Sequence, residues 1–115
     1  MDELLEIIRC TTGWKATWYE LMKIGERSIN MARLYNIREG FTSNDDKIPE
    51  LFFHNFNGGP LHGKGAMNRK DFEKAKRFRY QLMGWDEKSG IPTESKLVDL
   101  ELDWLVDIIK KNFVS

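Results

Sequence analysis

The glycine-rich stretch from Gly58 to Gly65 imitates a motif with known chemistry. It runs Gly-Gly-Pro-Leu-His-Gly-Lys-Gly, similar to the loop whose backbone amides cradle a nucleotide phosphate. That chemistry needs Ser or Thr after the lysine to hold magnesium, and a buried strand before the loop. Gly65 stands where the hydroxyl is required, and residues 52–56 make a poor buried strand. The stretch therefore predicts a plain glycine loop.

Metal-ligating residue types are few and widely spaced. Cys10, His54 and His62 match no zinc spacing, and structural zinc takes four ligands. The adjacent Asp45 and Asp46 lack the alternating oxygen ligands of a calcium loop, so a turn cap is the simpler interpretation. Consecutive carboxylates also diverge, which places them poorly for acid–base catalysis across one bond. The sequence thus predicts no catalytic, cofactor-binding or metal-ligating residue.

A basic helix is expected over residues 68–83. Its charged residues are Arg69, Lys70, Lys74, Lys76, Arg77 and Arg79 against Asp71 and Glu73. Aromatic residues interleave with them, as in helices that bind a nucleic-acid backbone. The alternatives are a solvated face or a face that meets an acidic partner, and the neutral charge of the whole chain gives nucleic acid no support.

A second group of charges lies within residues 24–41. Glu26, Arg27, Arg33, Arg38 and Glu39 share a predicted helix that is apolar on several sides, so some of them must point inward. Inward charges persist only when they are paired and hydrogen-bonded. They indicate either a network of salt bridges or a helix that docks on another domain.

The bulk composition predicts one domain over residues 1–115. Lys+Arg and Asp+Glu both number 18, so the formal charge is zero, and Cys10 is the only cysteine. No apolar run approaches the roughly 20 residues of a membrane span. The start, Met-Asp-Glu, lacks the basic region of a signal peptide, so a reducing, cytoplasmic setting is expected.

Hydrophobic periodicity predicts helices that account for most of the chain. The expected ranges are 2–11, 18–38, 69–83, a short helix after Thr93, and 104–111 with Asp103 as its cap. Thr17 and Glu20 form a capping box, Gly84 suits a helix end, and Gly25 predicts close packing against the long helix. Residues 41–67 form a long loop, and no stretch alternates as a strand does. We expect an all-α fold, a compact bundle of four to five helices around a long central helix.

Five ordered motifs resemble one known family. They are Gly25-Glu26-Arg27, Asn36-Ile37-Arg38-Glu39-Gly40-Phe41, Asp45-Asp46-Lys47-Ile48-Pro49, Gly84-Trp85-Asp86-Glu87 and Gly90-Ile91-Pro92-Thr93. Together they resemble the C-terminal region, in the third domain, of the tungsten-containing aldehyde:ferredoxin oxidoreductases. The resemblance implies structural or interdomain roles for these residues. Three departures from the family pattern occur. Leu51 replaces an expected Arg, Glu101 replaces a Gly, and the chain has Arg79-Tyr80 and Met83-Gly84-Trp85 where the family tends to have Tyr-Tyr before Arg-Gly-Trp.

The resemblance also implies what the chain does not contain. Full-length members oxidise aldehydes to acids with a tungsten or molybdenum bis-pterin, and a 4Fe-4S cluster passes electrons to ferredoxin. Four cysteines hold that cluster, and Cys10 alone cannot. We therefore expect no cofactor in this chain and no activity from it alone.

Three hypotheses follow. The first is a C-terminal oxidoreductase domain, as a gene remnant, a separate subunit or an excised piece, whose partners are the other domains or subunits. The second is a stand-alone helical interaction module that forms a homodimer through the helix at 18–38. The third and weaker one is a nucleic-acid binder through the basic helix at 68–83.

Overall fold

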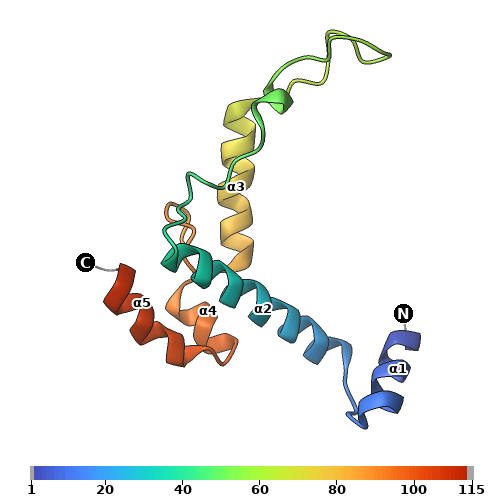
Figure 1. Cartoon of the computed structure of the whole chain (residues 1–115), viewed down its shortest axis with the longest axis vertical. Helices are drawn as coiled ribbons and strands as arrows, with labels where there is room; N and C mark the ends of the chain where they lie inside the picture. Colours follow the sequence, from blue (N-terminus) through green and yellow to red (C-terminus); the bar gives the residue numbers. More distant parts are fainter. Residues whose placement is uncertain (1, 114–115) are drawn as a thin grey trace.

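The computed structural model describes residues 2–113 and consists of helices and loops (Figure 1). The helices are α1 (Asp2–Thr12), α2 (Trp18–Arg38), α3 (Arg69–Met83), α4 (Glu94–Asp99) and α5 (Val106–Phe113), with 3-10 turns η1 (Glu50–Phe53) and η2 (Asp103–Leu105). The described range contains isolated β-bridges but no strand. The all-α prediction is confirmed. Across the same range, no helix is both long and apolar enough to cross a membrane.

The helix ends follow from local chemistry. At the start of α2 the Thr17 hydroxyl accepts from the Glu20 amide, and the Glu20 carboxylate accepts from the Thr17 amide, as the capping box predicts. Asn68 caps α3, and Thr93 caps α4. The expected Asp103 cap is wrong. Leu102 precedes η2 instead, so Asp103 opens that turn and its side chain caps nothing.

The core lies where α2 meets the C-terminal helices. It is a cluster of five buried aliphatic side chains, Leu34, Leu97, Leu100, Leu102 and Val106. Burial of each such side chain is worth about 1.5–3 kcal/mol, so this cluster fixes the α2–α4–α5 corner. Five side chains are a small core for a chain of this length.

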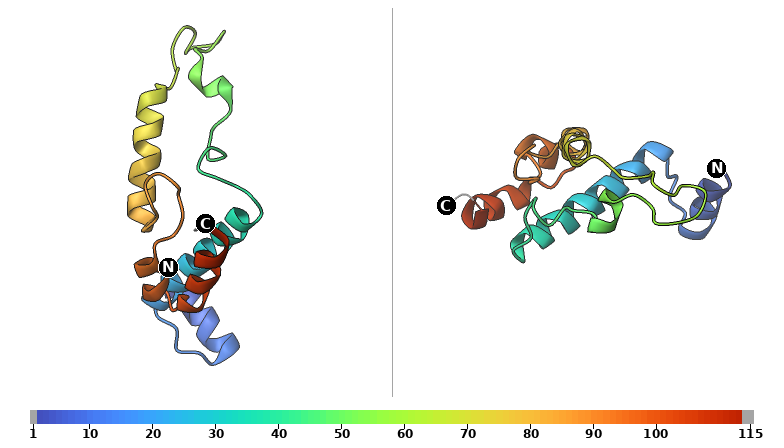
Figure 2. Two further views of the ribbon diagram at one scale, coloured as in Figure 1. Left: turned by 90° about the vertical axis from the view of Figure 1, so that its left-hand side faces the viewer. Right: turned by 90° about the horizontal axis from the view of Figure 1, so that it is seen from above.

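The expected compactness is not found. The radius of gyration is 19.1 Å and the extents are 55 × 46 × 21 Å, whereas a compact chain of this length has a radius of gyration of about 13 Å. Figures 1 and 2 show α1 beyond one end of α2, while α3 and the loop before it project as an arm. Phe78 and Leu82 of α3 are exposed. The close packing expected at Gly25 is not found, because no atom outside the neighbouring backbone of α2 lies within 4 Å of the position that a Cβ would occupy. The helices carry the expected apolar side chains, but many of these side chains remain exposed in the part of the chain that the structure describes.

Candidate functional site

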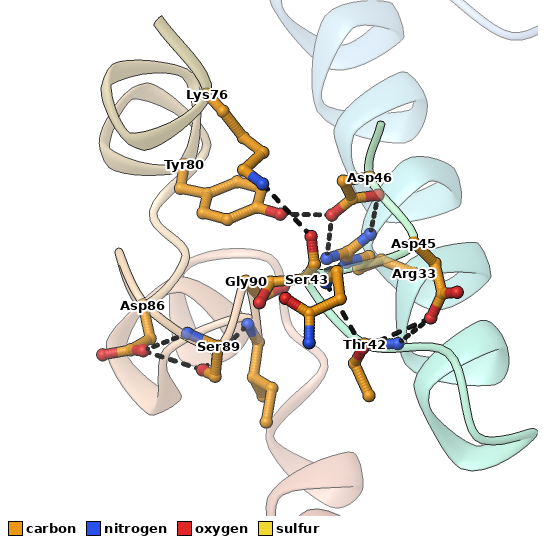
Figure 3. Close-up of polar contacts among 12 residues, drawn as sticks. Arg33, Thr42, Ser43, Asp45, Asp46, Lys76, Tyr80, Asp86, Ser89 and Gly90 are labelled. Atoms are coloured by element: carbon orange, nitrogen blue, oxygen red, sulfur yellow. Dashed lines mark hydrogen bonds and ion pairs between the residues drawn. The ribbon is translucent and has the colours of Figure 1, made fainter. Parts of the chain in front are cut away.

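Arg33 of α2 lies at the centre of a polar junction (Figure 3). Its Nη1 and Nη2 donate to the two carboxylate oxygens of Asp46, at 2.8 and 2.6 Å, and its Nε donates to the Gly90 carbonyl at 2.9 Å. The side chain of Arg33 is 10% exposed and that of Asp46 is 32% exposed. A bidentate pair of this kind fixes orientation as well as distance. It ties α2 to the turn after it and to the loop before α4.

Tyr80 brings α3 into the same junction. Its hydroxyl donates to Asp46, and its side chain is buried. The guanidinium carbon of Arg33 lies 5.6 Å from the ring centroid of Tyr80 and 4.8 Å from that of Trp85, within cation–π range. Lys76, one turn earlier on α3, donates to the Ser43 carbonyl at 3.3 Å. The base of α3 is therefore held at the junction while its other end projects.

The fully buried Asn30 extends the junction along α2. Its Oδ1 accepts from the Trp85 indole at 2.8 Å, and its Nδ2 donates to the Glu26 carbonyl at 2.8 Å. An unpaired buried amide would cost about 1–3 kcal/mol, so this pairing is what permits the burial. Among the described side chains, no buried nitrogen or oxygen lacks a hydrogen-bond partner.

Two glycines allow the chain to approach these side chains. Gly90 has φ +67°, and a Cβ there would lie 2.4 Å from Arg33 Nη2. Gly84 has φ +70°, and a Cβ there would lie 2.9 Å from Lys96 Cδ. The Asp86 carboxylate accepts from the Ser89 amide at 2.7 Å and so holds the loop that presents the Gly90 carbonyl. Both glycines are needed for conformation and for space.

The electrostatics of the junction favour fixed charge states. Hydrogen bonds from Arg33 and Tyr80 hold the pKa of Asp46 below its usual range, against an opposing effect of burial. Burial and the hydrogen bond to Asp46 raise the pKa of Tyr80 to about 12. Near neutral pH, Asp46 is therefore charged and Tyr80 is protonated. These charge states do not favour acid–base catalysis by either group at that pH, and the contacts of the junction join helices to loops.

Other signature residues lie apart from the junction. Glu26 pairs with Lys96 at 2.7 Å, whereas Arg27 makes no ion pair or hydrogen bond within residues 2–113. Arg27 lines an open groove of about 390 Å³ together with Trp14, Tyr19 and the 99–101 segment. Glu26 is therefore part of the salt-bridge network expected on this helix, whereas Arg27 is not.

The residues after α2 shape a turn. Arg38 pairs with Glu39 at 3.0 Å on the surface, and Gly40, with φ +95°, ends the helix. The Phe41 amide donates to the Asn36 carbonyl at 3.0 Å. These contacts bring the chain around toward Asp46.

Three further signature residues support loops. The Asp45 carboxylate accepts from the Thr42 amide at 2.8 Å, which is the turn cap predicted from sequence. Pro49 directly precedes η1, and the buried Pro92 forms a β-bridge with Trp85. Of the predicted signature residues, Asp46 and Gly90 accept hydrogen bonds from Arg33, and the Trp85 ring lies within cation–π range of it.

Asn30, Arg33 and Tyr80 were not among the signature residues predicted from sequence. A pattern in the sequence does indicate two of these residues, Asn30 and Arg33. Glu26, Asn30 and Arg33 follow one another at four- and three-residue steps, so they share one face of α2. An Asn on a mostly apolar helix indicates a buried hydrogen-bonding position. Tyr80 gave no comparable signal.

The residues present do not fit a metal or an iron–sulfur cluster. Among residues 2–113, no group of three or more His, Cys, Asp or Glu could hold a metal ion, and Cys10 is an exposed side chain on α1. His54 lies 3.5 Å from the Glu50 carboxylate on the surface. In the glycine loop, the Phe56 and Gly63 amides donate to the Lys64 and Phe56 carbonyls, so they are not available to a phosphate.

Comparisons with known proteins show which family the chain is similar to. The family model for aldehyde ferredoxin oxidoreductase, domains 2 and 3, matches residues 1–102. The tungsten-containing aldehyde ferredoxin oxidoreductase of Pyrococcus furiosus is 34% identical over 101 residues, which cover 86% of this chain and 16% of that protein. The Pyrococcus horikoshii protein of the same name is 34% identical over 104 residues, 89% of this chain and 16% of its own length.

A solved structure shares the fold. The active-site complex BamBC of benzoyl coenzyme A reductase, in complex with 1,5-dienoyl-CoA, superposes with a TM-score of 0.77 at 24% identity. The match covers 97% of this chain and 15% of that one. The sequence matches and the motif order therefore show that the chain belongs to the aldehyde ferredoxin oxidoreductase family, within the region of its domains 2 and 3.

Proposed function

We propose that this chain is a helical scaffold segment of an aldehyde ferredoxin oxidoreductase-like protein and is inactive alone. The observation that carries the proposal is the open shape, with apolar side chains exposed on every long helix. Examples are Leu4 and Ile7 of α1, Met22, Ile24, Ile29 and Met31 of α2, and Phe78 and Leu82 of α3. Exposed apolar surface this extensive is typical of an interaction surface.

The polar junction supports the same proposal. It fixes α2, the base of α3 and the 84–92 loop relative to one another with partly buried hydrogen bonds. Such a junction preserves the shape of a piece whose own core is small. The apolar faces then meet the rest of the enzyme in a fixed arrangement.

The chemistry would come from the rest of the protein. We propose that an assembled enzyme oxidises aldehydes with ferredoxin as electron acceptor, as the names of the relatives indicate. Its tungsten cofactor and iron–sulfur cluster would be held by parts outside this segment. The partners of the segment would be those parts, as domains or subunits, in a cytoplasmic enzyme.

A chimaera tests this proposal. The matching region of the Pyrococcus furiosus relative is replaced by residues 1–102 of this chain, and the purified protein is assayed for tungsten content and aldehyde oxidation. A scaffold segment should give a folded chimaera that holds tungsten and keeps measurable activity. The control carries Gly90→Val in the same segment and should lose both.

The opposite outcome is equally clear. A folded chimaera with full tungsten but no activity would mean that this segment no longer supports the chemistry. A chimaera that cannot fold while the isolated chain is stable would favour the stand-alone module. One observation favours that second candidate. The elements α2, η2 and α5 line an apolar groove of about 320 Å³, which includes Met31, Tyr35 and Trp104.

A further inference from the structure

Charge is unevenly distributed along this neutral chain. Residues 47–83 contain eight Lys or Arg and three Asp or Glu, a net charge of +5, so the remaining residues carry −5. The basic stretch is the projecting arm of Figure 1, made of η1, the glycine loop and α3. The molecule therefore has a basic arm and an acidic body.

The cations on one face of α3 have no ion-pair partner among residues 2–113. Lys70, Lys74 and Arg77 follow one another at four- and three-residue steps, are exposed, and form no ion pair within the described residues. By contrast, Arg69 pairs with Glu50, and Lys76 pairs with Glu73. Unpaired cations on one helix face provide a surface for an acidic partner.

Apolar side chains lie beside these cations. Phe78 is 60% exposed and Leu82 is 63% exposed, one turn apart on α3. Phe78 is one turn beyond Lys74, so the basic and apolar positions adjoin. A partner for this face needs carboxylates next to an exposed apolar side chain.

The α4–α5 corner of the body has those features. Glu101, Asp103 and Asp107 are exposed, and none of them forms an ion pair in the part of the chain that the structure describes. Asp103 and Asp107 are four residues apart, and Trp104 between them is 57% exposed. None of the observed ion pairs links α3 to this corner within one molecule.

We propose that the basic face of α3 in one copy docks on the acidic corner of a second copy, defined by Glu101, Asp103 and Asp107. Opposite charges steer the approach, and Phe78 and Leu82 meet Trp104 to add apolar contact. A zero net charge leaves no overall repulsion between copies. A nucleic acid fits less well, because the body that carries −5 repels a polyanion. This inference concerns the chain on its own, because the proposed function assigns Phe78 and Leu82 to contacts with the rest of an assembled enzyme.

The first test measures the oligomeric state by sedimentation velocity. The chain should self-associate at about 50 mM NaCl, and its association constant should fall by at least about tenfold at about 500 mM NaCl. A chain that is monomeric at both salt concentrations, up to millimolar protein, would overturn the proposal.

A charge swap locates the contact. The double variant Lys74→Glu/Arg77→Glu and the double variant Asp103→Lys/Asp107→Lys should each be monomeric at low salt. Mixed together they should form a heterodimer, because the reversed charges again match. Asp2→Lys/Glu3→Lys, on exposed α1, is the matched control and should leave association unchanged. Circular dichroism checks that every variant keeps its helix content.

Two results of the swap would reject the proposed contact. Self-association that persists in both double variants would place the interface elsewhere, for example on α2. If wild type does not self-associate but Lys74→Glu/Arg77→Glu abolishes binding to a fluorescent single-stranded oligonucleotide, the basic face serves nucleic acid instead.

Discussion

Arg33 binds both carboxylate oxygens of Asp46 across a separation of 13 residues, and this pair joins α2 to the turn that redirects the chain toward α3. Tyr80 reaches the same carboxylate from α3, and the Gly90 carbonyl reaches the same guanidinium from the loop before α4. Four segments, namely α2, the turn after it, α3 and the loop before α4, thus meet at one ion pair. Its energetics govern several expected outcomes.

Asp46→Asn should destabilise the chain by about 2–4 kcal/mol. The substitution leaves the Arg33 guanidinium mostly buried without a counter-charge, and the exposed part of Asp46 keeps the loss below that of a fully buried pair. Urea denaturation followed by circular dichroism measures it. The surface pair gives the control, since Glu39→Gln should cost less than about 1 kcal/mol. Equal effects of the two substitutions would mean that Asp46 is not central.

Gly90→Ala should destabilise by more than about 2 kcal/mol. The added methyl would lie 2.4 Å from Arg33 Nη2, and a φ of +67° adds conformational strain. Gly25→Ala is the matched substitution, because Gly25 lies inside α2 and its new methyl would have no atom within 4 Å outside the neighbouring helix backbone. It should stabilise by up to about 1 kcal/mol. Thermal unfolding of both variants tests the pair, and a neutral Gly90→Ala would contradict the junction geometry.

Glu101→Gly should stabilise the chain slightly. Glu101 is the non-glycine residue with positive φ, +57°, in the described part of the chain, and such a conformation costs about 1–2 kcal/mol. Glycine removes that strain but loses more entropy on folding, so the net gain should be about 0.5–1 kcal/mol. Glu101→Gln keeps the strain and should change nothing. A destabilised glycine variant would show that the carboxylate has a structural role.

Stability should fall at both extremes of pH. The pKa of Asp46 is lowered by folding, so its contribution is present above its unfolded value of about 3.9 and is lost as pH falls through the folded value. The pKa of Tyr80 is raised to about 12, so its contribution is present below about pH 10 and is lost as pH rises toward 12. Tyrosinate absorbance should reveal the late titration. In Tyr80→Phe, the loss of stability between about pH 10 and 12 should be smaller than in wild type.

Arg27→Ala should cost less than about 0.5 kcal/mol in the isolated chain, because Arg27 makes no ion pair or hydrogen bond in the described structure. Glu26→Gln weakens the contact between Glu26 and Lys96. Because the Glu26 carboxylate is partly exposed, the free energy of unfolding should fall by only about 0.5–1 kcal/mol. Denaturation curves separate the two. A loss of several kcal/mol at Arg27 would reveal a contact that the structure does not contain.

Sequence predicted the helices well, because their ends carry local signals. The Thr17–Glu20 capping box, the Asn68 cap and Gly84 each act within one helical turn. Family membership could also be predicted, because five motifs occur along the chain in the order that the family has them. The overall compactness could not be predicted. An apolar position such as Phe78 of α3 indicates that the side chain packs against another surface, but it does not indicate whether that surface belongs to the same chain.

The polar junction was only partly predictable. Asp46, Trp85 and Gly90 lie in motifs, but their common partner Arg33 is separated from them by 13 to 57 residues. Residue spacing reveals contacts within one helix, not contacts between a helix and distant loops. The clearest sign in the sequence was Asn30, a polar residue among apolar positions of α2, and the structure shows that its side chain is buried and hydrogen-bonded.

Hydrogen exchange on α1 tests the central claim most directly, namely that this scaffold is completed by the rest of an oxidoreductase. An isolated 11-residue helix with exposed Leu4 and Ile7 should exchange its amides rapidly. We predict that the amides of α1 and of the exposed face of α2 exchange at least about tenfold more slowly in the chimaera than in the isolated chain. Equal exchange in both proteins would contradict it.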